Sequence, residues 1–99
     1  MPIWKLTPKD INSRDWEASI YRGVVIIRAE SERRARQIAS NTFGIATEVK
    51  LGERIAINPW GQSLHVSAAT IFDNKYHDSG NEGVVGPPEA LQYVDIRGN

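Results

Sequence analysis

A run of four branched apolar residues, Val24 to Ile27, places the strongest constraint on the fold. Branched side chains favour extended backbone, and successive residues of a strand point to opposite faces of a sheet. A strand that is apolar on both faces needs cover on both sides, from its own chain or from a partner. We therefore expect a central strand within residues 20–29, around which the rest of the chain is organised.

A helix is expected directly after this strand. Ser31 suits the N-cap position, because its hydroxyl can accept a hydrogen bond from a backbone N–H of the first turn. Gly44 suits the position that ends a helix. Between these two residues, apolar side chains recur at helical spacing and form a narrow stripe. The stripe consists of Ala35, Ile38, Ala39 and Thr42, closed by Phe43.

Two further segments alternate in the manner of strands: residues 3–7, ended by Pro8, and residues 65–72. Residues 45–49 are a weaker strand candidate, and residues 90–96 suit either an edge strand or a short helix. The resulting β-β-α-β-β order predicts an α+β fold. We expect a small antiparallel sheet of four to five strands with one main helix packed on one face.

The chain has 99 residues, which is the length of one domain, so we treat 1–99 as a single α+β domain. Residues 73–86 are polar and glycine-rich, which predicts a long flexible loop, and residues 97–99 are expected to fray. One helix cannot cover a four-stranded sheet completely. We therefore expect apolar sheet surface to remain for a partner, most simply in a homodimer.

Composition narrows the class of protein. The chain has no cysteine, which excludes disulfides, thiolate metal ligands and a cysteine nucleophile. Small secreted domains usually depend on disulfides, and residues 1–9 lack the apolar stretch of a signal peptide, so we expect a cytoplasmic protein. The longest apolar run is far shorter than the roughly 20 residues that cross a bilayer, so no membrane partner is expected.

Charge is balanced overall and uneven along the chain. Twelve basic residues match twelve acidic ones, yet residues 1–36 are basic and residues 59–99 are acidic. The two parts either attract each other within the fold or leave a basic face for an acidic partner or a nucleic acid. The planar guanidinium group suits phosphate recognition, although a solvated helix face is the interpretation we favour. The arginines concerned are Arg28, Arg33, Arg34 and Arg36.

Four side chains are weak candidates for a metal or acid–base site, and their spacing matches no metal motif. A calcium loop beginning at Asp73 fails, because Lys75 and Val84 occupy ligand positions. Residues 61–65 lack the second glycine of a nucleophile elbow. We therefore expect no catalytic residue, no cofactor and no metal. The weak candidates, which we favour as solvated loop residues, are His65, Asp73, His77 and Asp78.

Three segments carry a resemblance to a known group of proteins. Residues 25–39, VIIRAESERRARQIA, resemble a strand-to-helix unit of many short bacterial proteins. Together with Ile3–Pro8 and the Pro59-Trp60 pair, this unit is similar to a family of short bacterial proteins of unknown function. The resemblance implies a small accessory protein and brings no catalytic role with it.

These features favour a non-enzymatic protein-interaction or accessory module, self-associating or docked onto a larger protein. Nucleic-acid binding through the arginine-rich helix face is the alternative, and a small metal-binding or hydrolytic protein is a weaker one. Trp60 is a candidate exposed anchor, although we favour its convergence with Trp4 and Trp16 in one core. The candidate interaction residues are Val24, Ile26, Arg28, Arg33, Arg34, Arg36 and Trp60.

Overall fold

A computed structural model describes residues 1–45, 57–73 and 75–96. Two short 3-10 helices, η1 (Arg14–Ala18) and η2 (Pro59–Gly61), accompany four strands and two α-helices. The regular elements are β1 (Ile3–Pro8), β2 (Val25–Arg28), α1 (Glu32–Phe43), β3 (Val66–Ile71), β4 (Gly83–Gly86) and α2 (Pro88–Ile96). The expected α+β class, with one main helix, is confirmed.

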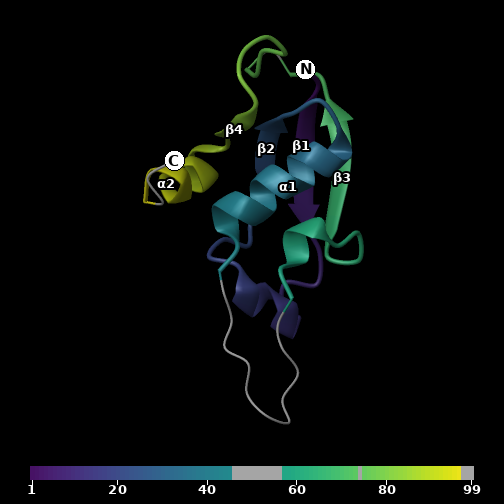
Figure 1. Ribbon diagram of the computed structural model, residues 1–99, viewed down its shortest axis with the longest axis vertical. Helices are drawn as coiled ribbons and strands as arrows, with labels where there is room; N and C mark the ends of the chain where they lie inside the picture. The colour runs from purple at the N-terminus through teal and green to yellow at the C-terminus, as the bar shows by residue number, and fades with distance from the viewer. Residues whose placement is uncertain (46–56, 74, 97–99) are drawn as a thin grey trace.

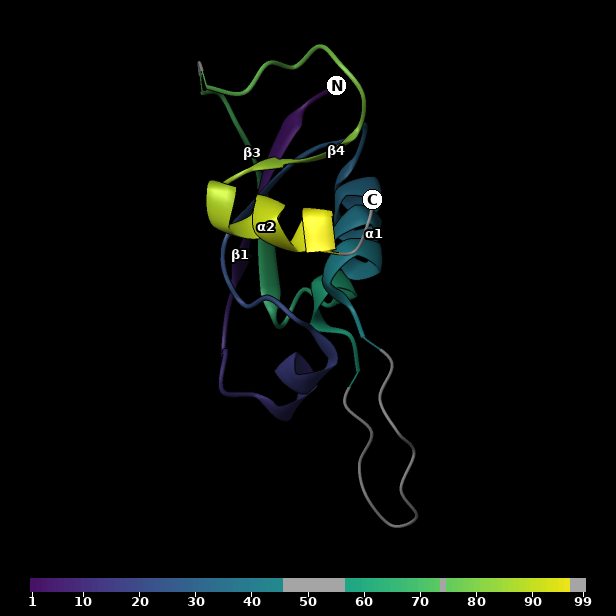
Figure 2. The same cartoon turned by 90° about the vertical axis from the view of Figure 1, so that its left-hand side faces the viewer.

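The four strands form one antiparallel sheet in the order β3-β1-β2-β4 (Figure 1). Trp4 in β1 lies opposite Ile27 in β2 and opposite Thr70 in β3, which fixes the register of the three strands. α1 runs across one face of the sheet, and α2 packs against β4 and α1 (Figure 2). The outer strands of the sheet are therefore β3 and β4.

The ends of α1 follow the local sequence signals. The Ser31 hydroxyl accepts a hydrogen bond from the Arg34 N–H at 3.1 Å, as expected of an N-cap. The Gly44 N–H donates to the Ser40 carbonyl at 2.9 Å and ends the helix. Ala35 and Ala39 are fully buried, and their small side chains allow α1 to lie close to the sheet.

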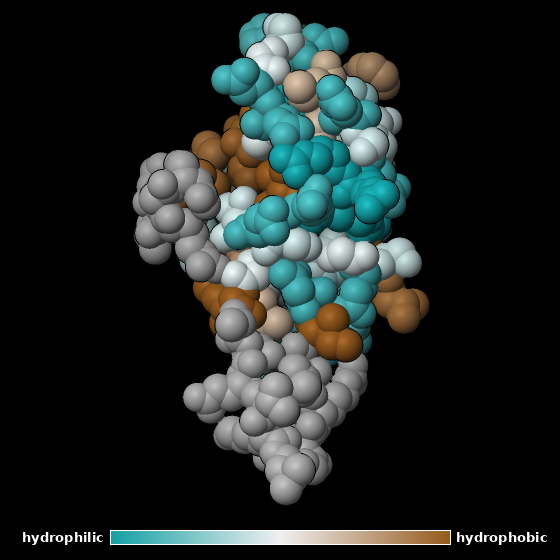
Figure 3. Space-filling view, in the orientation of Figure 1, coloured by the Kyte–Doolittle hydropathy of each residue, from teal (hydrophilic) through white to brown (hydrophobic). Residues whose placement is uncertain are grey.

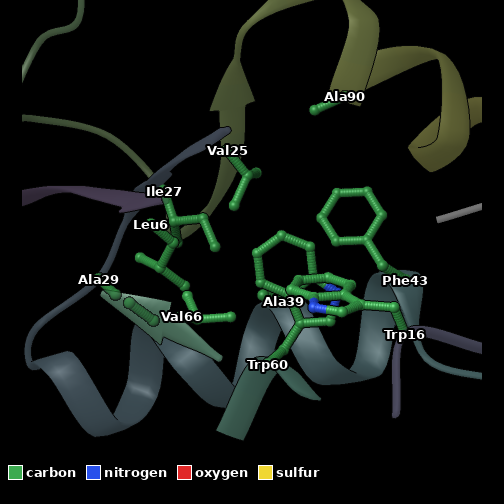
Figure 4. Packing of buried hydrophobic residues seen from close by; sticks show 11 residues of the cluster. Leu6, Trp16, Val25, Ile27, Ala29, Ala39, Phe43, Trp60, Val66 and Ala90 are labelled. Atoms are coloured by element: carbon green, nitrogen blue, oxygen red, sulfur yellow. The ribbon is translucent and has the colours of Figure 1, made fainter. Parts of the chain in front are cut away.

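Aromatic side chains from separate parts of the chain meet in the core (Figure 4). The rings of Trp16 and Trp60 contact edge to face with centroids 5.3 Å apart, and Phe43 lies 5.4 Å from Trp60. Both buried indoles keep a hydrogen bond, from Trp16 to the Lys9 carbonyl at 3.1 Å and from Trp60 to Ser19 Oγ at 2.9 Å. Trp4 packs against this cluster, so the three tryptophans converge on one core.

The fourth strand lies where a loop was expected. The last four residues of the segment 73–86 form β4, which pairs with β2 through Ile26 opposite Gly86 and Ile27 opposite Val84. Glycine is disfavoured in strands, so the sequence of residues 83–86 does not indicate a strand. The strand forms because it pairs with β2. Residues 90–96 belong to α2, the helical alternative. The expected strand at 45–49, beyond residue 45, and the expected fraying at 97–99 fall outside the described residues.

Candidate interaction site at the β3 edge

The apolar strand β2 is covered on both faces by this chain. Val25 and Ile27 face α1 and are fully buried, while Ile26 on the opposite face is 5% exposed and Val24 is half-buried. The expected leftover apolar surface is therefore not found at Ile26. Its neighbour in β4, Gly86, lies so close to the Tyr76 ring that an added Cβ would come within 2.7 Å of it. Residues 75–82 thus fold back over the sheet.

Arg28 holds this segment in place from the end of β2. Its Nε donates to the His77 carbonyl at 2.9 Å, and one terminal nitrogen donates to the Asn81 carbonyl at 2.9 Å. Gly80 lies against the same guanidinium group, since a Cβ there would come within 2.7 Å of it. Arg28, a candidate for phosphate binding, is therefore engaged by backbone carbonyls of its own chain.

Two of the three remaining candidate arginines also form hydrogen bonds with carboxylates of their own chain. Arg34 Nε donates to both carboxylate oxygens of Glu82, at 2.9 and 3.1 Å. These side-chain hydrogen bonds lower the pKa of Glu82 and raise the pKa of Arg34. Arg36 bonds Glu32 at 3.1 Å, whereas Arg33 is exposed. The face of the molecule that α1 crosses is largely hydrophilic (Figure 3). The structure therefore does not present the four arginines as one unengaged basic face.

The weak metal candidates divide between two places. His65 Nε2 lies 3.0 Å from a carboxylate oxygen of the buried Asp15, which also accepts the Ile57 N–H at 3.1 Å. His77 lies beyond the opposite end of the six-residue strand β3, which spans about 20 Å. The structure therefore does not bring the two histidines together. The sequence gives no signal for the Asp15–His65 contact, which joins residues 50 positions apart.

The other three candidates lie along one groove. Asp73, His77 and Asp78 line a groove of about 920 Å³ at the end of β3, with Ile3, Ile71 and Phe72 on its apolar wall. Within the described ranges, no three histidine, aspartate or glutamate side chains are grouped so that they could hold a metal ion. The groove is therefore next to the end of β3, where Thr70, Ile71 and Phe72 line it.

The backbone of β3 is paired on one side. Lys9 donates to the His65 carbonyl at 2.7 Å, and Ala29 donates to the Pro2 carbonyl at 3.2 Å. Antiparallel ladders alternate, so the odd residues of β1 bond β3 and the even residues bond β2. In β3 the odd residues consequently bond β1, and the N–H and C=O groups of Ala68 and Thr70 face outward. We call the side of β3 that faces away from β1 the β3 edge.

The side chains of the β3 edge are small and uncharged. Neither a charged residue nor a proline occurs from Val66 to Phe72, and Ser67, Ala69 and Thr70 are exposed. The two most exposed large apolar side chains among the described residues flank this strand. Leu64, just before it, is 80% exposed, and Phe72, just after it, is fully exposed. The uncharged run was the signal in the sequence, but the sequence did not reveal that it lies at an outer edge.

Comparisons with known proteins do not supply a function. No known protein family, curated protein or solved structure matches the chain. In the part of the chain that the structure describes, no helix is long and apolar enough to cross a membrane. The function has to be inferred from the geometry of the β3 edge and of the groove that continues it.

Proposed function

We propose that the protein is a non-enzymatic interaction module that binds an extended segment along the β3 edge. The observation that carries this proposal is the outward-facing backbone of Ala68 and Thr70 on a strand without charge. Main-chain groups of this kind bind an added strand by continuing the sheet, and pockets beside the strand provide specificity. The groove beside Phe72 supplies such a pocket.

The contrast between the two outer strands supports the proposal. Folded proteins protect sheet edges with charged side chains, prolines, bulges or a covering helix. At β4 the ladder is irregular between Ile26 and Ile27, and α2 packs against the strand. β3 has neither a proline nor a charge, and of the described elements it contacts β1 and η2 most closely. An edge that lacks these protections is suited to receive a strand.

The alternatives remain predictions that the contacts do not favour. Nucleic-acid binding would require Arg28, Arg34 and Arg36 to leave carbonyl and carboxylate partners that they already bind. A metal-binding or hydrolytic site would require His65 and His77 to converge, and they lie at opposite ends of β3. Trp60 is fully buried, so its side chain faces the core.

A peptide titration tests the proposal. Isotope-labelled protein is titrated with a synthetic peptide of residues 64–72, LHVSAATIF, and the amide resonances are followed by NMR. We expect saturable shifts centred on the amides of Ala68 and Thr70. Ala68→Pro in the protein should abolish them, because it removes an outward N–H and leaves the ladder to β1 intact.

Arg33→Ala is the matched control, because it alters the exposed face of α1 and should leave the shifts unchanged. Shifts that survive Ala68→Pro, or that centre on residues 33–40, would contradict the proposal. Absence of any shift in a folded sample would also contradict it.

A further inference from the structure

Two exposed apolar side chains lie at opposite ends of the β3 edge. Leu64 precedes the strand and Phe72 follows it, and both are largely in contact with water. When two copies of this strand pair antiparallel, the beginning of one strand lies beside the end of the other. A second copy therefore brings Leu64 of each chain to Phe72 of the other, twice in one interface. A parallel arrangement would instead bring like ends together and leave the complementary ends apart.

We infer that the segment bound at the β3 edge is β3 of a second copy, paired antiparallel about a two-fold axis. This inference rests on the proposed function and names its partner. Charge is consistent with it, because the neutral run from Val66 to Phe72 places no like charges opposite each other. The resulting interface is isologous, the commonest form of association in homodimers.

The alternation of the ladder restricts the register. Outward-facing residues must lie opposite outward-facing residues, so the two-fold axis passes through a residue of β3 and not between two residues. Leu64 lies in the turn that leads into β3, and it is as far from Ala68 along the chain as Phe72 is, so an axis at Ala68 brings this turn towards the partner's Phe72. Ala68 then exchanges two hydrogen bonds with the partner's Ala68. Val66 donates its N–H to Gln62 at 3.0 Å, so it contributes its carbonyl, which accepts from the partner's Thr70.

The groove gives the arriving leucine a place to pack. Phe72 forms part of its wall together with Ile3 and Ile71. Leu64 of one copy therefore reaches an apolar wall on the other, instead of an isolated phenylalanine. Removing both side chains from water stabilises the pair in proportion to the apolar area buried.

Sedimentation equilibrium of the full chain over a range of concentrations tests this inference. We expect a reversible dimer that Phe72→Ser weakens about tenfold or more in Kd, since each dimer loses two Phe–Leu contacts. Phe72 is fully exposed in the single chain, so this variant should fold. Ile11→Ser is the matched control, because Ile11 is 48% exposed in a turn outside β3 and should leave the Kd unchanged.

A cysteine variant tests the register, because the native chain has no cysteine. Opposite residues of a hydrogen-bonded antiparallel pair have Cα atoms about 5.5 Å apart. Disulfides span Cα separations of about 4.4–6.8 Å. Mild oxidation of Ala68→Cys should therefore give a disulfide-linked dimer, whereas Ile11→Cys should stay single.

The outcomes separate this inference from the proposed function. A chain that remains a monomer at every concentration, but binds the peptide of residues 64–72 at Ala68 and Thr70, overturns the second-copy inference alone. A monomer that also fails to bind the peptide overturns both. A dimer insensitive to Phe72→Ser and not linked through Ala68→Cys shows that association uses another surface, and this too overturns the inference.

Discussion

Arg34 and Glu82 show how single side chains connect the basic first part of the chain to its acidic last part. The Arg34 guanidinium, on α1, bonds the Glu82 carboxylate next to β4. Together with the Arg28 bonds to the carbonyls of His77 and Asn81, it ties the segment before β4 to the rest of the fold. Of these contacts, the Arg34–Glu82 ion pair is the one that joins opposite charges from the two parts.

The Arg34–Glu82 pair predicts a pH effect. Hydrogen bonds from Arg34 lower the pKa of Glu82 below its ordinary value of 4.5. The folded-state pKa is thus below the unfolded one, so the pair stabilises the fold above pH 4.5 and this stabilisation is lost as pH falls through the folded-state pKa. Carboxyl-carbon NMR of Glu82 should show a low titration midpoint that Arg34→Ala raises. The neighbouring Arg33→Ala should leave the midpoint low, and a midpoint indifferent to Arg34→Ala would contradict the assigned cause.

At the residue scale, the sequence predicts what depends on near neighbours. Ser31 could be recognised as the N-cap because its partner lies three positions away. The engagement of Arg28 by carbonyls 49 and 53 positions away could not be recognised, because it depends on how the segment after β3 folds back. The same holds for Asp15 and His65.

Elements with a strong local pattern were predicted well. α1 has the expected bounds, and β1 and β3 lie within one or two residues of the expected segments. β4 was missed, because two of its four residues are glycines and its stability comes from pairing with β2. β-propensity describes how readily an isolated segment becomes extended, whereas pairing with the neighbouring strand decides whether residues 83–86 form a strand.

The junction between α1 and η2 predicts a substitution effect at the element scale. A Cβ on Gly44 would come within 2.4 Å of the Ser40 carbonyl and 2.1 Å of Asn58 Nδ2, so the backbone would have to shift. We expect Gly44→Ala to lower the free energy of unfolding by about 1–3 kcal/mol, the usual cost of overpacking. Urea denaturation measures this difference.

Gly61→Ala is the control, because the nearest atom to its added Cβ is Ser40 Oγ at 3.9 Å, an ordinary contact distance. Equal free energies of unfolding for Gly44→Ala and the native chain would show that this junction is less tightly packed than the structure indicates.

For the whole molecule, the order of elements was enough to predict the α+β class, but not the location of the unpartnered surface. The apolar surface expected to remain for a partner was on a face of β2, and residues 75–82 fold back over that face. Among the residues that the structure describes, the strand side without a pairing strand is instead the β3 edge, whose position depends on the strand order β3-β1-β2-β4. Strand order is a long-range property that alternation within a segment does not encode.

Amide hydrogen exchange at β3, measured at low and high protein concentration, tests the account most directly. The amides of Ala69 and Ile71 donate to β1 and should be protected at both concentrations. The amides of Ala68 and Thr70 should exchange rapidly in dilute protein and slow about tenfold or more well above the dimer Kd. Phe72→Ser should restore rapid exchange at the high concentration. Exchange at Ala68 and Thr70 that does not change with concentration would contradict pairing of the β3 edge with a second copy.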